Sequence, residues 1–329
     1  MKGGISVNKK NIIIMAAATV ILILCPLFCG DYILTVLTTV MITSILGQSW
    51  NLLSGYAGQF SFGQAAFFGI GAYASAVLYM QFGISPWIGI IAGMIAAALA
   101  GLGLGFLSFK CRIKGDYFAL VTLAFAELLR LLVYNSANTA FNGPSGLFVN
   151  YIKGGDISAF QFSSWEAYFY IFLGFAFIIT LLMMKLKTTK FGLEMIAIRE
   201  NEIAANALGT NVFRKKLSVI AISAALAALA GGFYAQYYLF IDPSSVFGTD
   251  ISIQAIIVCI IGGSGTAFGP VLGAFILVPV QEITASLFTD ISGINMVFYG
   301  ILMVVFIMFA PNGILGIIGK TGKKRRLMS

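Results

Sequence analysis

The chain has 329 residues, of which 59% are hydrophobic and only 10% are charged, and its mean hydropathy is +0.96. A typical soluble domain is about 25% charged, so twenty basic and twelve acidic side chains cannot cover a water-soluble protein of this size. The composition excludes an ordinary soluble protein and predicts one whose apolar surface is solvated by lipid.

Ten apolar stretches are suited to crossing a bilayer, which takes about 20 apolar residues in a helix. They run roughly over 11–30, 32–53, 61–81, 86–109, 116–134, 165–186, 217–240, 251–264, 268–289 and 293–311. The first is longer than the apolar core of a typical signal peptide and no small-residue cleavage site follows it, so we expect it to be retained. The stretch 251–264 is short, and a half-helix is the alternative to a full crossing there.

Positive charge predicts the orientation of these spans. With ten crossings and the N-terminus inside, 18 of the 20 lysines and arginines fall on the cytoplasmic side, Lys153 lies outside and Arg130 lies within a span. Such a bias is the usual topology signal, so the net charge of +8 reflects orientation rather than a nucleic-acid partner.

We expect one all-α transmembrane domain over 1–329, a polytopic membrane helix bundle with both termini cytoplasmic. An external loop is expected over 135–164 and a basic cytoplasmic tail over 312–329.

Small residues recur every four positions along the fourth span. They are Gly89, Gly93, Ala97, Gly101 and Gly105. A ridge of this kind lets two helices approach closely in lipid, so it predicts tight packing of this span within the bundle.

Two glycine-rich stretches at membrane depth, 55–64 and 262–270, fall in different halves of the chain, and each contains a Phe-Gly pair. Broken helices at matching positions of two halves are a sequence pointer to a transport pathway. Tight turns between packed helices are the structural alternative. The residues expected near the pathway are Gly55, Gly58, Gln59, Ser61, Phe62, Gly63, Gln64, Gly262, Gly263, Ser264 and Gly265.

Two acidic residues lie inside predicted spans beyond the first turn, where ionisable groups are functional candidates by default. Glu127 and Arg130 are three residues apart on one helix face, so a structural ion pair is favoured and a place in the pathway is the alternative. Glu282 has no local partner and is a second pathway candidate. Two carboxylates in a chain without histidine make a poor proton relay, which argues against a proton-driven pump.

The longest internal cytoplasmic segment, 187–216, has the pattern of an amphipathic helix. One helical stripe consists of Leu193, Ile196, Glu200, Ile203, Ala207 and Leu208. Gly209 follows as a terminating glycine, so we predict a single helix over roughly 193–208. A helix that binds the membrane surface is usually strongly basic on its polar face, whereas this one carries three glutamates against Arg199. The pattern favours docking on a protein partner, with a helix tucked beneath the bundle as the alternative.

Two segments carry a resemblance to a known family. They are Asn-Leu-Leu-Ser-Gly-Tyr-Ala-Gly-Gln-Phe-Ser-Phe-Gly-Gln at 51–64 and Phe-Gly-x5-Ile-Arg-Glu-Asn-Glu-x2-Ala-x2-Leu-Gly at 191–209. With 115–130 and 262–274, they make nearly the whole chain resemble the permeases of high-affinity branched-chain amino-acid importers, of the LivM type. Related permeases for urea or short amides share much of the pattern, so the substrate stays open.

The resemblance implies a membrane subunit of an ATP-binding-cassette importer. Its implied partners are a second homologous permease, two cytoplasmic ATPase subunits and an external substrate-binding protein. The segment 187–216 resembles the coupling loop of that family. The ATPase contacts that the resemblance implies are Gly192, Arg199, Glu200, Asn201, Glu202, Ala205, Leu208 and Gly209.

Other function classes find less support. The chain should lack its own motor, because the near miss to a P-loop at Gly319-Lys320-Thr321 has Ile314 where the first glycine is required. A transporter that works alone would need a coupling-ion site, such as Glu282 with unwound carbonyls near Gly262. A membrane enzyme is disfavoured because no nucleophile–base pair or metal cluster appears. We therefore expect no cofactor and no metal.

Overall fold

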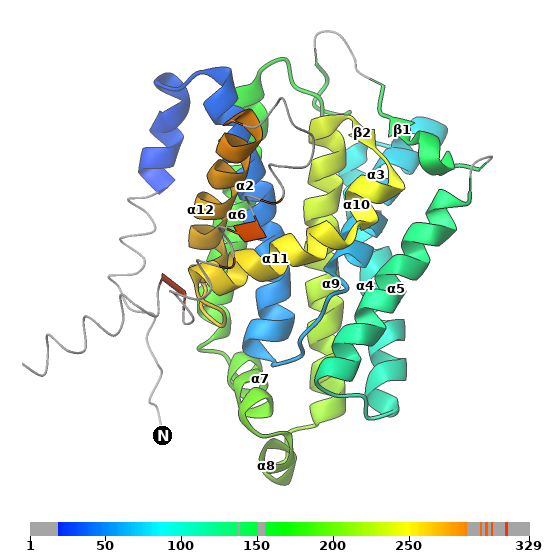
Figure 1. Cartoon of the computed structure of the whole chain (residues 1–329), viewed down its shortest axis with the longest axis vertical. Helices are drawn as coiled ribbons and strands as arrows, with labels where there is room; N and C mark the ends of the chain where they lie inside the picture. The colour runs from blue at the N-terminus through cyan, green and yellow to red at the C-terminus, as the bar shows by residue number, and fades with distance from the viewer. Residues whose placement is uncertain are drawn as a thin grey trace, which may run out of the picture.

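The computed structural model of the protein describes residues 19–136, 139–150 and 155–287, together with 297, 300, 301, 304, 313 and 314. These residues form an almost entirely helical bundle (Figure 1). Large parts of the predicted spans 11–30 and 293–311, and of the tail 312–329, lie outside the described residues.

The elements follow one another along the chain as a series of long helices with short connections. They are the 3-10 helix η1 (Cys25–Leu27), α2 (Asp31–Trp50), the π-helix η2 (Asn51–Tyr56), α3 (Gln64–Phe82), α4 (Pro86–Lys110), α5 (Asp116–Tyr134), the 3-10 helix η3 (Gly143–Ser145), β1 (Leu147–Phe148), α6 (Trp165–Leu186), α7 (Lys190–Glu200), α8 (Glu202–Ala207), α9 (Val212–Tyr238), β2 (Phe240–Ile241), α10 (Pro243–Phe247), α11 (Thr249–Gly262) and α12 (Gly269–Leu287).

Eight helical stretches among the described residues are long and apolar enough to cross a membrane. They are Asp31–Tyr56, Gln64–Phe82, Pro86–Lys110, Asp116–Tyr134, Trp165–Leu186, Val212–Tyr238, Pro243–Gly262 and Gly269–Leu287. They match the eight inner predicted spans, so the polytopic membrane helix bundle is confirmed. The count of ten crossings and the cytoplasmic termini stay predictions, because the first and last expected spans fall largely outside the described residues.

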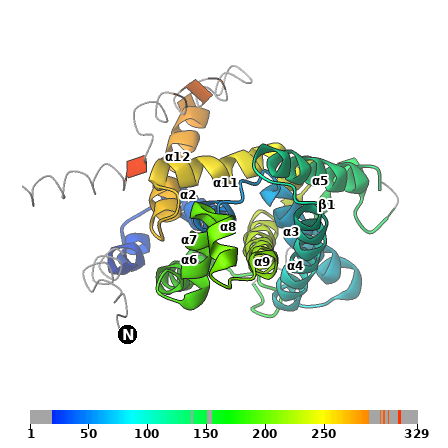
Figure 2. The same ribbon diagram turned by 90° about the horizontal axis from the view of Figure 1, so that it is seen from below.

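Helix α11 differs from its neighbours in direction. Figures 1 and 2 both show α11 lying across the bundle, whereas α2, α4, α6 and α9 run along the long axis. With 14 residues it is about 21 Å long, shorter than the hydrocarbon core of about 30 Å. The half-helix alternative for 251–264 is therefore the better description of this segment.

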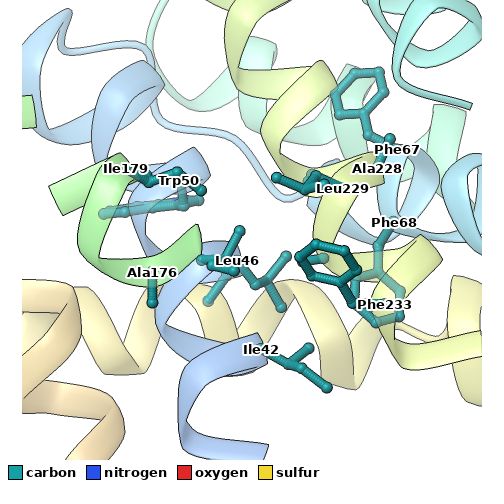
Figure 3. Close-up of a cluster of buried hydrophobic side chains, with 14 of the residues drawn as sticks. Ile42, Leu46, Trp50, Phe67, Phe68, Ala176, Ile179, Ala228, Leu229 and Phe233 are labelled. Atoms are coloured by element: carbon teal, nitrogen blue, oxygen red, sulfur yellow. The ribbon is translucent and has the colours of Figure 1, made fainter. Parts of the chain in front are cut away.

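The second half of α2 forms the centre of the bundle. Every residue from Val40 to Trp50 is buried. Figure 3 shows Ile42, Leu46 and Trp50 of α2 in a cluster of apolar side chains that α3, α6 and α9 also supply. These side chains are only 0–6% exposed, so they are closely packed. Helix α2 is therefore the central helix against which α3, α6 and α9 pack.

The small-residue ridge of α4 packs against α3 and α9, as predicted. A Cβ atom at Gly93 would lie 3.0 Å from the Cα of Gly71, and one at Gly101 would lie 3.0 Å from the Cβ of Ala224. The opposite face of α4 carries exposed large side chains such as Ile95 and Leu99. The helix thus presents its small residues to the bundle and its large ones to lipid.

The two ends of the bundle differ in structure. At one end β1, within the predicted external loop 135–164, pairs antiparallel with β2, which follows α9 (Figure 1). At the other end lie α7 and α8, from the predicted coupling loop 187–216. The two loops therefore lie at opposite ends of the long helices, as the predicted topology requires.

Candidate coupling and pathway site

The segment 187–216 contains two helices, so the prediction of one helix over 193–208 is wrong. The break falls at Asn201, whose backbone is extended (φ −160°, ψ 109°). Its Oδ1 accepts hydrogen bonds of 3.0 Å from the backbone N–H groups of Ile203 and Ala204. Asparagine favours this N-cap position because its side chain satisfies helix-end donors better than it supports a helix interior. The result is a bend between α7 and α8.

The end of α8 follows the prediction. Gly209 has φ +86°, and its N–H donates to the Asn206 carbonyl at 2.9 Å, while the Thr210 N–H donates to the Ala205 carbonyl at 3.1 Å. This pair of bonds is the Schellman arrangement, which favours glycine at the left-handed position. Beside it, Leu208 is 86% exposed and Ile203 is 80% exposed. Two apolar side chains at the tip of the loop are a candidate contact for another protein.

One face of α7 is buried against the bundle. Gly192, Met195 and Ile198 are buried, and a Cβ atom at Gly192 would collide with the carbonyl of Leu186. Among the predicted ATPase contacts, Gly192 and Ala205 are therefore packing residues in this chain. The exposed ones are Arg199, Glu200, Asn201, Leu208 and Gly209, and Glu202 is partly exposed.

Arg199 connects α7 to the first glycine-rich stretch. Its Nη1 donates a hydrogen bond of 2.8 Å to the carbonyl of Gly55, and a Cβ atom at Gly58 would lie 2.6 Å from the Arg199 Cγ. Its Nη2 donates to Glu200 Oε1 at 2.7 Å. The guanidinium is thus held between the exposed end of α7 and the backbone of η2, which continues α2.

Arg199 also contacts the second glycine-rich stretch, because a Cβ atom at Gly265 would lie 3.0 Å from its Nη1. A Cβ atom at Gly55 would lie 2.7 Å from the Gly265 nitrogen, so the two stretches touch. Asn51, four residues before Gly55, also bonds to the second stretch. Its Oδ1 accepts from the Gly265 N–H at 2.7 Å and its Nδ2 donates to the Thr266 carbonyl at 2.8 Å. Gln48 adds a bond of 2.6 Å to the Ala267 carbonyl. Stretches that lie in different halves of the chain therefore meet at one place, directly above α7.

Both stretches have irregular backbone at this meeting point. The first changes from a π-helix to irregular chain after Tyr56, and Gly58 has φ +69°. The second turns between α11 and α12, with φ +117° at Gly263 and φ +70° at Gly265. Backbone groups freed from helices at membrane depth need partners within the protein, and the side chains of Asn51 and Gln48 supply several of them.

The other pathway candidates in 55–64 lie deeper in the bundle, where they form hydrogen bonds to neighbouring helices. Gln64 is fully buried, and its Nε2 donates to Ser223 Oγ while its Oε1 accepts from Ser49 Oγ, both at 3.2 Å. The Ser61 carbonyl accepts from Trp50 Nε1 at 2.8 Å. These bonds connect the irregular chain before α3, and α3 itself, to α2 and α9. Gln59 and Gly63 are likewise buried.

Aromatic side chains lie on the irregular chain before α3. Phe62 is half-buried, and Phe60, which is 39% exposed, lies edge-on to it with ring centres 5.5 Å apart. Sequence reasoning did not single out Phe60, Asn51 or Gln48. Asn51 and Gln48 are polar residues near the end of the apolar run 32–53, and that unusual position is the signal that could have identified them.

Charged side chains surround the coupling segment. Glu202 Oε2 lies 2.7 Å from Lys114 Nζ of the α4–α5 turn, and its other oxygen accepts from Lys216 Nζ of α9. Burial by itself would raise the pKa of Glu202, but the hydrogen bonds from Lys114 and Lys216 outweigh it and lower the pKa below its usual value. The pKa of Lys187 is lowered by burial and by the charge of Arg199. Glu202 therefore stays ionised and joins α8 to α9 and to the α4–α5 turn.

The two membrane carboxylates lie apart from this meeting point. Glu127 and Arg130 form the predicted ion pair, with Arg130 Nε 2.9 Å from Glu127 Oε2. Glu127 is eleven residues beyond the start of α5, about 16 Å along the helix. Glu282 is half-buried on α12, and in the part of the chain that the structure describes it forms no ion pair.

A family model described as "Branched-chain amino acid transport system / permease component" matches residues 32–307. The chain belongs to this family. The chain is similar to a relative from Escherichia coli strain K12, "High-affinity branched-chain amino acid transport system permease protein LivM", at 32% identity over 95% of this chain and 76% of that protein.

Two further relatives of this permease differ in name. "Probable branched-chain amino acid transport permease protein LivH" of Methanocaldococcus jannaschii is 26% identical over 82% of this chain and 86% of its own length. "Guanosine ABC transporter permease protein NupQ" of Bacillus subtilis strain 168 is 28% identical over 51% of this chain and 55% of its own length. No solved structure matches the chain. The expected family is confirmed, and this permease is a multi-pass membrane protein with a role in transport rather than an enzyme.

Proposed function

We propose that this permease is one of two homologous membrane subunits of an ATP-binding-cassette importer for branched-chain or similar small apolar amino acids. The two permeases enclose the translocation pathway, two cytoplasmic ATPase subunits bind the 187–216 loops, and an external binding protein delivers the substrate. Family membership and the name of the Escherichia coli relative support this assignment. The match to a relative named LivH as well supports a second, homologous permease as partner.

The contact of Arg199 with both glycine-rich stretches is the observation that carries the coupling mechanism. The exposed tip of the loop, with Ile203 and Leu208, is suited to a groove on an ATPase subunit. A displacement of α8 is passed to α7, because the two helices are separated by Asn201 alone. From α7 it reaches Gly55 and Gly265 through the Arg199 guanidinium. Backbone that is already irregular at these glycines can change between two arrangements more easily than a continuous helix.

In this mechanism the ATPase subunits drive the pathway between outward and inward access. Their closure moves both coupling loops, and each loop shifts the inner end of α2 together with the turn between α11 and α12. Phe60 and Phe62 lie on the segment that would be displaced. Apolar rings at this position are suited to a constriction that passes small apolar solutes.

Loop-tip substitutions test the proposed function. Lysine at the tip, in the variant Ile203→Lys/Leu208→Lys, should abolish both copurification of the ATPase subunits and uptake of leucine into proteoliposomes containing the whole transporter. The chain should still reach the membrane, because both side chains are exposed and support no packing. The matched control is Ile157→Lys, which changes an apolar residue with 73% exposure in the opposite, external loop. Full ATPase binding by the tip variant would refute the docking assignment.

A second measurement separates the importer from a transporter that works alone. The purified permease in liposomes, without ATPase subunits or binding protein, should show no uptake of leucine, isoleucine or valine. Uptake by the permease alone would contradict the proposal. Guanosine belongs in the same assay, because one relative is named for it.

A further inference from the structure

The cysteines of this chain occupy different environments. Cys259 of α11 is fully buried, and its Sγ donates a hydrogen bond of 3.0 Å to the Gly47 carbonyl of α2. Cys25 and Cys29 are only partly buried, and their Sγ atoms lie 3.2 Å apart. A free cysteine that serves only for packing is usually among the most buried residues of a protein, so packing alone does not account for this pair.

A turn of the backbone brings the two thiols together. Cys25 begins the 3-10 helix η1, and its carbonyl accepts hydrogen bonds from the N–H groups of Phe28 at 3.1 Å and of Cys29 at 3.0 Å. The second bond closes one helical turn, which places the Cα atoms of Cys25 and Cys29 about 6 Å apart. This separation is within the range of about 4.4–6.8 Å that disulfides span.

A small shift is enough for a bond to form between the two sulfur atoms. They are about 2.05 Å apart in a disulfide, so they must approach by roughly 1 Å from their present 3.2 Å. Cys29 lies between the end of η1 and the start of α2, and Gly30 after it is extended (φ −76°, ψ 168°). The backbone at Cys29 is thus outside a regular helix, where it can take up a shift of this size.

The turn is fixed to the bundle at the end that carries β1 and β2. The Tyr170 hydroxyl donates to the Ile23 carbonyl at 3.1 Å, and Tyr170 belongs to the first turns of α6, after the predicted external loop. In Figure 1 the turn, in blue, lies near the top of the view, whereas α7 and α8 lie at the bottom. Because the proposed ATPase subunits bind α7 and α8 from the cytoplasm, the thiol pair faces the external side.

The chemistry of the pair favours oxidation over metal binding. A structural zinc site takes four ligands, and in the part of the chain that the structure describes no third histidine, cysteine, aspartate or glutamate joins the two thiols. Disulfides form and persist in extracytoplasmic compartments, which are oxidising, and are rare in the cytosol. Two neighbouring thiols on the external side are therefore suited to a disulfide.

We propose that Cys25 and Cys29 form a disulfide on the external side of the membrane, which closes the turn that leads into α2. The inference rests on the proposed function, because the importer topology places the pair outside. The oxidant is the disulfide of an external thiol–disulfide oxidoreductase. One cysteine thiolate attacks this disulfide and releases the first oxidant thiol, and the second cysteine then attacks the mixed disulfide and releases the other. The oxidant thus gains two thiols, which take up the two protons that the cysteines lose.

The closed turn acts on the central helix of the bundle. Helix α2 begins at Asp31, two residues after Cys29, and its other end continues into η2, which contains Gly55. A covalent turn limits how far the start of α2 can separate from the preceding segment. The disulfide therefore holds the outer end of α2 in place while the proposed coupling movement acts on η2.

The test reads the oxidation state of each cysteine in the complete transporter. Cells are denatured in acid, free thiols are alkylated with N-ethylmaleimide, and the digested permease is analysed by mass spectrometry. We expect the peptide that contains Cys25 and Cys29 to carry no maleimide and to be lighter than the dithiol by two hydrogen atoms. Reduction before alkylation should add two maleimides to it. Cys111 and Cys259 should be alkylated without reduction, as controls within the same chain.

Two variants separate an internal disulfide from other modifications. In Cys29→Ser, Cys25 should lose its internal partner, so the disulfide form of the peptide should disappear, whereas Cys111→Ser should leave it unchanged. Cys25→Ser repeats the measurement should Cys29→Ser fail to assemble. Two maleimides on the peptide of the unsubstituted chain without prior reduction would overturn the proposal.

A second measurement distinguishes failure of this inference from failure of the proposed function. In right-side-out membrane vesicles that have been treated with a reductant, a membrane-impermeant maleimide should label Cys25 and Cys29 but not Cys111, which lies in the predicted cytoplasmic turn 110–115. Labelling of Cys111 alone would reverse the topology, so the proposed function and the disulfide would fail together. If Cys25 and Cys29 are labelled from outside but remain dithiols in cells, only the disulfide assignment fails.

Discussion

Arg199 and Gly55 are separated by 144 residues, yet the Arg199 Nη1 donates a hydrogen bond of 2.8 Å to the Gly55 carbonyl. Arg199 belongs to α7, which is not one of the candidate membrane spans, and Gly55 lies near the end of the central span Asp31–Tyr56. The bond joins the segment that resembles a coupling loop to backbone that has left regular helical geometry. The surrounding contacts with Gly58 and Gly265 place the Arg199 side chain of α7 against both glycine-rich stretches.

Loss of this bond should uncouple ATP hydrolysis from uptake. A hydrogen bond from a charged donor contributes about 1.5–3 kcal/mol, and about 1.4 kcal/mol corresponds to tenfold in an equilibrium. We therefore expect Arg199→Ala to lower leucine uptake by about tenfold or more while the ATPase subunits remain bound and hydrolyse ATP. Uptake and hydrolysis measured on the same proteoliposomes check this. The control Lys190→Ala removes another charge from α7 that is 91% exposed, and it should leave both activities unchanged.

The glycines beside Arg199 should resist replacement by alanine. Gly58 and Gly265 have φ near +70°, where a side chain costs roughly 1–2 kcal/mol, and the new methyl group would also press on Arg199. We expect Gly58→Ala to reduce uptake strongly, and the double variant Gly58→Ala/Arg199→Ala to lose less uptake than the two single losses combined, because removing Arg199 relieves the contact but not the backbone strain. Gly174→Ala is the control, because no atom lies within 4 Å of its Cβ position. Equal uptake by Gly58→Ala and Gly174→Ala would mean that the close contact has no role.

Local patterns in the sequence were sufficient to predict where the helices lie along the chain, but not which distant residues contact one another. Apolar run length predicted the eight candidate membrane spans, and the four-residue spacing from Gly89 to Gly105 predicted the packed face of α4. The bend at Asn201 was missed because apolar periodicity continues across it, while the cap that breaks the helix depends on one side chain. The meeting of the two glycine-rich stretches at Arg199 depends on contacts between distant parts of the chain, which no spacing within either stretch encodes.

The face of α4 that packs on α9 should tolerate no large side chain. At Gly101 a Cβ atom would lie 3.0 Å from the Ala224 Cβ and 3.3 Å from the Ile220 carbonyl oxygen. Overpacking of a well-packed core costs about 1–3 kcal/mol, so Gly101→Leu should lower the thermal unfolding midpoint in detergent by several degrees. Gly103→Leu, two residues away, faces open space and should have little effect. An equal loss in both variants would show that the side of the helix does not matter.

The stability that Glu202 contributes should depend on pH. Its pKa is lowered in the folded chain, because hydrogen bonds from Lys114 and Lys216 outweigh the effect of burial. A carboxylate with a lowered pKa stabilises the fold at neutral pH, and this contribution is lost as the pH falls through the folded-state pKa. Because Glu202 is partly exposed, the contribution is on the order of 1 kcal/mol.

Glu202→Gln should therefore lower the unfolding midpoint at pH 7, and the difference from the unsubstituted chain should shrink as the pH is lowered below the usual range for glutamate. Thermal unfolding followed by tryptophan fluorescence between pH 7 and pH 3 measures both curves. Glu200→Gln is the matched control, because its side chain is 68% exposed and pairs with Arg199 at the surface. A constant difference between Glu202→Gln and the unsubstituted chain across this range would mean that ionisation of Glu202 does not hold α8 to α9 and to the α4–α5 turn.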